Sequence, residues 1–311
     1  GVRHAVACAS GTDALLMALM ASGVGPGDAV FTSPFTFIAT AEAVQILGAT
    51  PVFVDIEPST FNMDASKLAT AITALRERNP ARHPLPACAK AITPKAVIAV
   101  DLFGLPADYD TITPLTDREG LVLIEDAAQS FGAAYKGKRA CTFGAIACTS
   151  FFPAKPLGAY GDAGMCFTDD ETLAAAMRSI RNHGGGGDRY EHVRLGLNGR
   201  LDTIQAAVLL AKFTIFQEEI QWRQEAAERY AHLLADIPGV TLPNFFDDKH
   251  SVWAQYSVQA RDAARRNRLR AELKDAGIPT AVYYPTPLHL QPVFRYLAYQ
   301  AGDFPVSETT A

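Results

Sequence analysis

The sequence predicts an α/β fold in which a mostly parallel sheet is sandwiched by helices. Short apolar runs alternate with helical patterns from the start of the chain to Thr168. The runs are apolar at consecutive positions, which is typical of strands covered by helices on both faces. The 311 residues are also enough to bury a large core, in one big domain or in two unequal ones.

Seven apolar runs are interpreted as strands of this sheet. They are Ala5–Ala9, Ala29–Thr32, Pro51–Asp55, Ala96–Asp101, Leu121–Glu125, Ala145–Ser150 and Gly164–Thr168. The helical patterns between several of them are Thr12–Ser22, Thr36–Leu47, Asp64–Leu75 and Asp108–Glu119. Gly48 follows the second of these patterns, where a glycine commonly ends a helix. Strands that alternate with helices in this way form parallel sheets.

The C-terminal part of the chain predicts a smaller α+β domain. Its expected elements are one long helix from Thr203 to Asp236, a strand near Trp253–Gln259 and an Arg-rich helix over Arg261–Ala276. We therefore expect a large domain in residues 1–215 and a small C-terminal domain in residues 216–311. The chain begins with Gly1 rather than Met and stops at Ala311 just after a turn-like stretch, Gly302–Pro305, so both domains are expected to be truncated.

Composition and charge argue against several classes of protein. The net charge of −5 and the pI of about 5.8 disfavour binding to nucleic acid through bulk electrostatics. The five cysteines contain no C-x-x-C pair, so we expect free thiols in the reducing cytoplasm. The seven histidines form no metal-binding pattern, and no apolar run approaches the roughly 18 residues that a membrane span needs. No metal, nucleic acid or membrane is expected as a partner.

Ser10-Gly11-Thr12 is a candidate phosphate site. A predicted strand ends there, and a helix begins whose free amides point back at the turn. Such a helix start binds phosphate through its amides and the positive end of its dipole. The alternative is a simple helix cap, which is the more common role of this pattern when it stands alone.

Asp126 and Lys155 are the candidate reactive residues. Asp126 closes an apolar strand, at the edge where open α/β sheets bind ligands. Lys155 lies in a Pro- and Gly-flanked loop among aromatic and small residues, where desolvation lowers the pKa of an amine and favours Schiff-base chemistry. Singly, the acid could be a loop cap and the lysine a solvated charge. Together with the candidate phosphate site at Ser10-Gly11-Thr12, called the phosphate cradle below, they predict a pyridoxal-phosphate site in which the acid pairs with the ring nitrogen.

Four motifs occur in order along the chain and carry a family resemblance. They are Ser10-Gly-Thr-Asp-Ala-Leu15, Glu125-Asp-Ala-Ala-Gln-Ser-Phe-Gly-Ala133, Ser150-Phe-Phe-Pro-Ala-Lys-Pro-Leu-Gly158 and Asn198-Gly-Arg-Leu-Asp-Thr-Ile-Gln-Ala-Ala207. The chain resembles the DegT-type sugar-nucleotide aminotransferases, within fold type I of the pyridoxal-phosphate enzymes. Some members with a histidine in place of the lysine are dehydratases. Because Lys155 is present, the resemblance implies transamination.

The resemblance also implies roles for individual residues. Lys155 would bind the cofactor aldehyde and move the proton, and Asp126 would pair with the ring nitrogen. The remaining cofactor residues would be Gly11, Thr12 and Ser150 at the phosphate, Phe37 stacked on the ring, Gln129 near the ring oxygen, and Asn198 at the phosphate of the partner subunit. The enzyme would be a homodimer with shared sites, and glutamate would be the amino donor.

The amino acceptor implied by the resemblance is a nucleotide-linked keto sugar used for surface polysaccharides. The motifs are most similar to those of enzymes acting on UDP-2-acetamido-2-deoxy-3-oxo-glucuronate, and dTDP- and GDP-linked keto sugars are the alternatives. Arg189 and Arg194, in a basic stretch beside the Gly184–Gly187 run, and His289 are the candidate substrate contacts. A solvated basic turn is the other interpretation of that stretch. A nicotinamide dehydrogenase would need a G-x-G-x-x-G motif, which is absent, and a regulator that binds cofactor without turnover is a further alternative.

Overall fold

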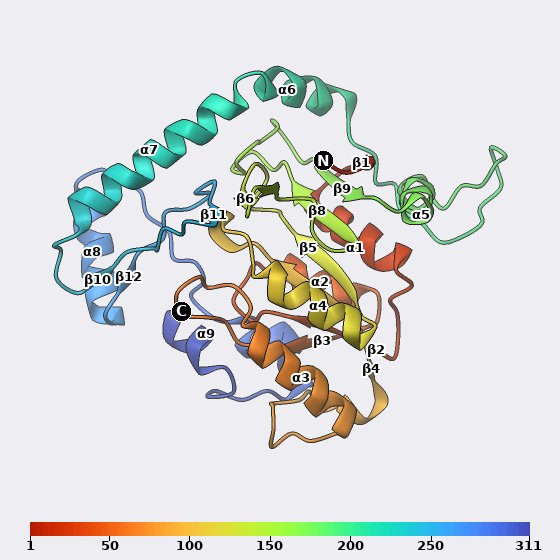
Figure 1. Cartoon of the computed structure of the whole chain (residues 1–311), viewed down its shortest axis with the longest axis horizontal. Helices are drawn as coiled ribbons and strands as arrows, with labels where there is room; N and C mark the ends of the chain where they lie inside the picture. Colours follow the sequence, from red (N-terminus) through yellow and green to blue (C-terminus); the bar gives the residue numbers. More distant parts are fainter.

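A seven-stranded sheet forms the centre of the molecule, in the order β1-β9-β8-β5-β4-β2-β3 (Figure 1). The structure, a computed structural model, describes residues 1–311. The strands are β1 (His4–Cys8), β2 (Asp28–Thr32), β3 (Thr50–Phe53), β4 (Thr93–Val100), β5 (Val122–Asp126), β8 (Ile146–Ser150) and β9 (Gly164–Thr168). β9 is antiparallel to both neighbours, and the other paired strands are parallel. The predicted fold class is confirmed, and each predicted strand overlaps an observed one.

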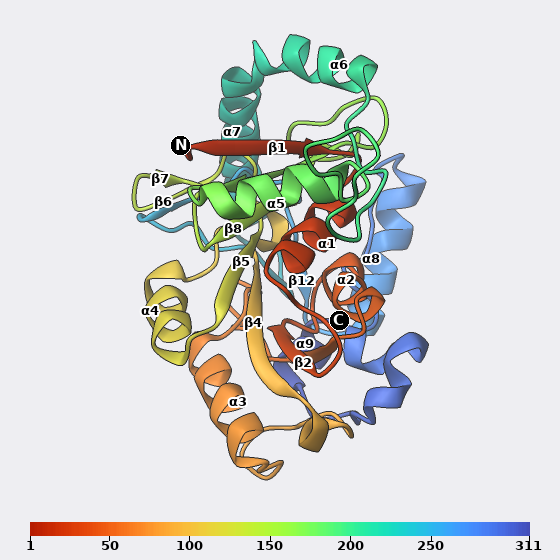
Figure 2. The same ribbon diagram turned by 90° about the vertical axis from the view of Figure 1, so that its right-hand side faces the viewer.

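Helices cover both faces of this sheet (Figures 1 and 2). α1 (Gly11–Ala21), α2 (Ala39–Ile46) and α5 (Glu171–Arg181) pack on one face, whereas α3 (Ala65–Glu77) and α4 (Tyr109–Glu119) pack on the other. Consecutive strand residues belong to opposite cores: Val30 packs with α1 and α2, and Phe31 packs with α3 and α4. This burial on both sides explains why the strands are apolar at consecutive positions.

The remaining elements lie outside the central sheet. The helices are α6 (Thr203–Phe213), α7 (Phe216–Leu234), α8 (Ala263–Asp275) and α9 (Pro305–Thr310). Short strands form two further sheets, β10 (Val240–Thr241) with β12 (Gln259–Ala260), and β11 (Lys249–His250) with β6 (Ala134–Tyr135) and β7 (Lys138–Arg139). None of the helices combines the length and the apolar character that crossing a membrane requires.

The prediction of one continuous helix from Thr203 to Asp236 was wrong. The chain bends between α6 and α7, where Ile215 has φ −108° and ψ 3°. Both residues at the bend are β-branched, and the Thr214 hydroxyl donates to the carbonyl of Ala211, 2.8 Å away. The bend turns Phe216 into a buried cluster with Phe151. Burial of this aromatic ring favours the bend over a straight helix.

The expected strand near Trp253–Gln259 is also mostly absent. Trp253 has a φ of +49°, which is incompatible with an extended strand. Its indole donates to Gln224 of α7, and its ring packs against Phe245 and Tyr256. Only Gln259–Ala260 pair as a strand. The expected Arg-rich helix is present as α8 and buries none of its residues.

The end of the chain returns to the large sheet (Figure 1). Phe53 of β3 packs with Phe294 and Phe304, and buried Asp55 accepts the backbone amides of Val306 and Ser307 at the start of α9. The division at residues 215 and 216 therefore stays a prediction: α7, α8 and the short strands lie on the outside, but the last segment shares the core of the large domain.

Candidate active site

The predicted site residues gather at the carboxyl ends of three strands. Ser10 follows β1, Asp126 is the last residue of β5, and Ser150 is the last residue of β8. The start of α1 lies directly against the end of β8, since a Cβ at Gly11 would lie 2.6 Å from the Cβ of Ser150. Only a glycine allows this approach. The structure therefore places the cradle beside the strand that leads to Lys155.

The start of α1 forms the cradle. Ser10 is the N-cap in extended conformation, and its hydroxyl accepts the amide of Asp13 at 3.0 Å. The amides of Gly11 and Thr12 have no acceptor within the helix, because the first turn lacks the preceding carbonyls. The serine thus acts as a simple cap, as in the alternative interpretation, and still leaves two amides free to bind an anion.

Asp126 is buried at the centre of this edge, with 4% of its surface exposed. Its carboxylate accepts the hydroxyl of Thr40 at 2.8 Å and the amide of Ala128 at 3.2 Å. Burial raises the pKa of Asp126, whereas these hydrogen bonds and the charge of Lys155 act in the opposite direction. A carboxylate with so few donors has lone pairs available for a further cationic N–H.

Lys155 lies half-buried in the loop after β8. Its backbone amide donates to the carbonyl of Phe152 at 2.8 Å, which fixes the loop. Burial lowers the pKa of the Lys155 amine, and the negative charge of Asp126 partly opposes this. Desolvation without a bound partner increases the neutral, nucleophilic form of an amine.

Gln129 joins the site to the C-terminal segment, which the sequence did not indicate. Its Oε1 accepts the amide of Phe103 at 2.8 Å, and its Nε2 donates to the hydroxyl of Tyr284 at 3.2 Å. Burial raises the pKa of the Tyr284 hydroxyl to about 12. Phe37, just before α2, leaves 57% of its surface exposed and therefore has a free ring face.

The residues expected to act across subunits lie on an exposed loop between α5 and α6. This loop extends away from the body of the molecule (Figure 1). Arg189, Arg194 and Asn198 are all exposed on it. Gly199 anchors the end of the loop beside the cradle, because its carbonyl accepts the amide of Ala9 at 2.9 Å. A single chain does not bring the two arginines to Lys155.

His289 occupies a place that does not suit a substrate contact. Its side chain is fully buried, Nε2 lies 3.0 Å from Glu308 Oε1, and its ring packs edge-on against Phe304. Burial lowers the pKa of His289, and the carboxylate of Glu308 opposes this. The histidine therefore packs the C-terminal segment onto the large domain, and we remove it from the proposed substrate residues.

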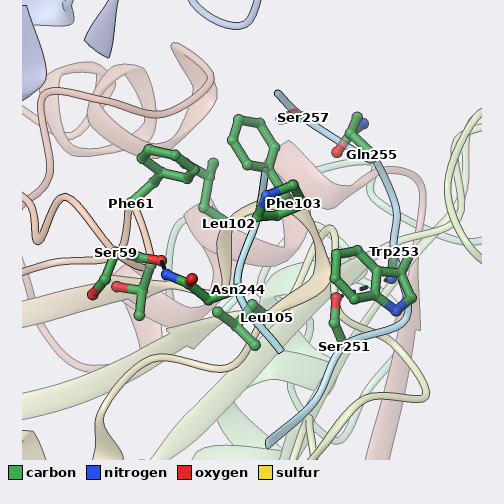
Figure 3. A pocket seen from close by; sticks show the side chains of 12 residues that line it. Ser59, Phe61, Leu102, Phe103, Leu105, Asn244, Ser251, Trp253, Gln255 and Ser257 are labelled. Atoms are coloured by element: carbon green, nitrogen blue, oxygen red, sulfur yellow. Dashed lines mark hydrogen bonds between the residues drawn. The ribbon is translucent and has the colours of Figure 1, made fainter. Parts of the chain in front are cut away.

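A pocket lies beyond Phe103, on the far side of its loop (Figure 3). It encloses a volume of ≈ 30 Å³, enough for about one water molecule. Phe61 and Leu105 line it from the large domain, and Asn244 and Trp253 from the smaller part of the chain. Phe103 thus borders a small cavity on one side, although the residue itself is buried.

The geometry agrees with the relationships of the chain. The model of the DegT/DnrJ/EryC1/StrS aminotransferase family matches residues 1–311. The chain belongs to this family. Among curated relatives of this aminotransferase, UDP-2-acetamido-2-deoxy-3-oxo-D-glucuronate aminotransferase of Pseudomonas aeruginosa is 47% identical over 311 residues, covering 100% of the chain and 79% of the relative.

Solved structures support the same assignment. A DegT/DnrJ/EryC1/StrS aminotransferase from Brucella abortus has a TM-score of 0.91 and 47% identity, and the match covers 99% of this chain and 78% of that one. NtdA from Bacillus subtilis, solved with bound cofactor PMP, has a TM-score of 0.83 and 30% identity over 99% and 67% of the two chains. This aminotransferase is a fold type I enzyme that depends on pyridoxal phosphate.

The residues present fit that cofactor. Its phosphate suits the two free amides of α1, its aldehyde suits the desolvated Lys155 amine, and its ring nitrogen suits the buried Asp126 carboxylate. When bound, pyridoxal phosphate supplies an electron-accepting ring that stabilises negative charge on a substrate carbon.

Proposed function

We propose that the enzyme transfers an amino group from glutamate to a nucleotide-linked keto sugar, UDP-2-acetamido-2-deoxy-3-oxo-glucuronate in the first instance, for surface polysaccharides. The observation that carries this proposal is the position of Lys155, half-buried in the loop after β8, at the same edge of the sheet as the buried Asp126 and the start of α1. The name of the Pseudomonas relative supports the sugar. dTDP- and GDP-linked keto sugars are the alternative acceptors. The five free cysteines support the cytoplasm as its location.

The proposed role of each residue follows from its position. Lys155 would hold the cofactor aldehyde, and its Nζ would accept and return a proton at the substrate carbon. Asp126 keeps the ring nitrogen protonated, since a carboxylate favours the cationic form. The supporting residues are Gly11, Thr12 and Ser150 at the phosphate, Phe37 against the ring face and Gln129 near the ring oxygen. An intact amine disfavours the alternative of a regulator without turnover.

The acceptor carries at least two phosphate charges, and the protein has a net charge of −5. A local basic patch must therefore hold the diphosphate. Five arginines lie between the end of α5 and the start of α6, namely Arg178, Arg181, Arg189, Arg194 and Arg200. The loop that carries Arg189 and Arg194 leaves both guanidinium groups exposed.

Neutralising Arg189 or Arg194 to Gln is expected to raise the apparent KM for the sugar nucleotide about tenfold, the usual effect of losing a charged hydrogen bond. The glutamate half-reaction should stay nearly unchanged, because that donor carries no phosphate. Arg268→Gln on exposed α8 is the matched control. Turnover is measured with glutamate on a panel of UDP-, dTDP- and GDP-linked keto sugars. Efficient transamination of ordinary keto acids, with no nucleotide sugar turned over, would disprove the proposal.

The proposed functional unit is a homodimer with shared sites. Large apolar side chains are exposed around the loop and α6, with 86% of Leu195, 75% of Ile204 and 72% of Leu210 accessible. Exposed apolar groups gathered in one region are typical of protein interfaces. Asn198 lies beside this region and is itself exposed. A second copy seated there would receive Asn198 at its own cofactor phosphate.

Hybrid dimers test this sharing. Inactive Lys155→Ala chains mixed with Asn198→Ala chains should regain about a quarter of the wild-type specific activity, because half of the dimers are hybrids and one of their two sites carries neither lesion. Each parent alone stays impaired. Subunit exchange is verified with two affinity tags, and the hybrids are purified through both. Purified hybrids that are no more active than the better parent would show that Asn198 acts within its own chain.

A further inference from the structure

Asp101 is a buried acid that the proposed chemistry does not use. It follows β4, is 0% exposed and is surrounded by donors. Its Oδ1 accepts the amide of Ala107 at 2.9 Å and the hydroxyl of Tyr109 at 2.8 Å. Its Oδ2 accepts the hydroxyl of Ser130 at 2.7 Å. These three hydrogen bonds satisfy the buried carboxylate, so Asp101 belongs to a specific polar network of the fold.

The two carboxylate oxygens face different parts of the site. Oδ2 reaches the turn that runs from Asp126 to Ser130, which also carries Gln129. Oδ1 reaches the start of α4 and the end of the loop Leu102–Pro106. The backbone adds a fourth contact, since the amide of Asp101 donates to the carbonyl of Asp126 at 3.1 Å. The Asp101 side chain thus connects the Asp126–Ser130 turn to the Leu102–Pro106 loop.

Several other contacts also hold that loop: the ring of Phe103 packs against Phe35 and Phe61, and the carbonyl of Gly104 accepts the amide of Val252 at 3.1 Å. Phe103 has a φ of +58°, a conformation that is uncommon for residues with a side chain. Asn62 holds the loop by accepting the amide of Leu102 and donating to the carbonyl of Leu105, both at 2.9 Å. The ring of Phe103 faces the pocket on one side (Figure 3) and lies 6.4 Å from Tyr283. The contacts of Asp101 add a link between this loop and the turn that carries Gln129.

The surroundings of Asp101 bear on whether its carboxyl group is ionised. Burial raises the pKa of Asp101 to about 6, while the hydrogen bonds from Ala107, Ser130 and Tyr109 oppose this. Glu125, on the adjacent strand β5, is the other buried acid here, and burial together with the charge of Asp101 raises its pKa well above the ordinary range. The three donors thus favour the charge on Asp101 over Glu125.

We propose that Asp101 is a positioning residue, which clamps the Asp126–Ser130 turn to the Leu102–Pro106 loop and so fixes Gln129 and Phe103 beside the ring. The consequence for the reaction rests on the proposed function, whereas the clamp itself does not. Asp101 acts through Gln129 and touches neither substrate nor cofactor. Without the clamp, the Phe103 amide and Gln129 Oε1 separate, and Gln129 loses its orientation toward Tyr284.

Two single-hydroxyl deletions separate this role from simple stability. Ser130→Ala removes only the hydrogen bond between Asp101 and the Asp126–Ser130 turn. Tyr109→Phe removes only the hydrogen bond between Asp101 and the Tyr109 side chain of α4. In cofactor-free protein, hydrogen exchange at the Leu102–Leu105 amides should become about tenfold faster in Ser130→Ala and stay unchanged in Tyr109→Phe. In the loaded enzyme, Ser130→Ala should lower kcat about fivefold and shift the cofactor absorbance, while Tyr109→Phe changes neither.

Equal exchange in the two variants, or unaltered loop exchange in Ser130→Ala, would overturn the clamp. Faster loop exchange with unchanged kcat and absorbance would overturn its role in positioning Gln129. The exchange measurement needs no substrate or cofactor. A wild-type enzyme that turns over no nucleotide sugar would therefore count against the proposed function and leave the clamp result standing.

Discussion

Lys155→Ala is expected to abolish the lysine-linked absorbance of the cofactor and to lower turnover by at least about 10⁴-fold. The reason is structural: no other residue of the Phe151–Gly158 loop has an amine, so nothing replaces the nucleophile or the proton carrier. Visible absorbance after loading with pyridoxal phosphate, followed by single-turnover kinetics with glutamate, measures both effects. Thermal unfolding of the cofactor-free variant should stay close to that of the wild type, because the amine has a desolvation cost and no bonded partner.

Lys212 provides the matched control for this prediction. Its amine lies close to the same loop, since it donates to the carbonyl of Gly158 at 2.6 Å. Lys212→Ala should retain the absorbance and most of the activity. Borohydride reduction of the loaded wild type should fix the cofactor to the peptide that contains Lys155. Label on the Lys212 peptide instead would refute the assignment.

Asp126→Asn is expected to have the second largest effect. An amide cannot stabilise a protonated ring nitrogen as a carboxylate does, so the ring withdraws electrons less well. The rate of the glutamate half-reaction should fall about 10²- to 10³-fold, as it does when one electrostatic partner of a reacting group is lost. The cofactor should remain bound, because Lys155 and the cradle are unchanged. Stopped-flow absorbance gives the rate.

Thr40→Val distinguishes the charge of Asp126 from its placement. This change removes the hydroxyl that donates to Asp126 and leaves the carboxylate in place. We expect a loss of less than about tenfold, the range of a single hydrogen bond. If Asp126→Asn transaminates at close to the wild-type rate, Asp126 is not the partner of the ring nitrogen. A Thr40→Val loss as large as that of Asp126→Asn would assign the effect to geometry rather than charge.

The central sheet and the local parts of the site could be predicted from the sequence. Strand runs, glycine stops and the Ser10-Gly11-Thr12 turn each depend on residues close together in the chain, and carboxyl ends of parallel strands necessarily share an edge. Asp126 and Lys155 could be recognised for that reason. Their burial and the direction of their pKa shifts follow from apolar neighbours within the same segments.

The contacts that could not be predicted join distant segments. Gln129 and Tyr284 are 155 positions apart, and no local pattern indicates their hydrogen bond. The bend at Thr214–Ile215 depends on the space that the Phe151 cluster offers to Phe216. His289 was expected to contact the substrate because the segment Pro285–Gln291 resembles the substrate-side segment of the family. Its burial arises from Phe304 and Glu308, which follow later in the chain.

The close approach between the start of α1 and β8 also determines when the cofactor site can exist during synthesis. β1 is held in the sheet only by β9, so His4–Cys8 must wait for Gly164–Thr168 to leave the ribosome. Until then the residues around Gly11 have no neighbouring strand to complete the cradle. Such distant pairing is a late folding event. The cofactor therefore recognises a chain whose central sheet is complete, and its binding stabilises that finished state rather than any earlier one.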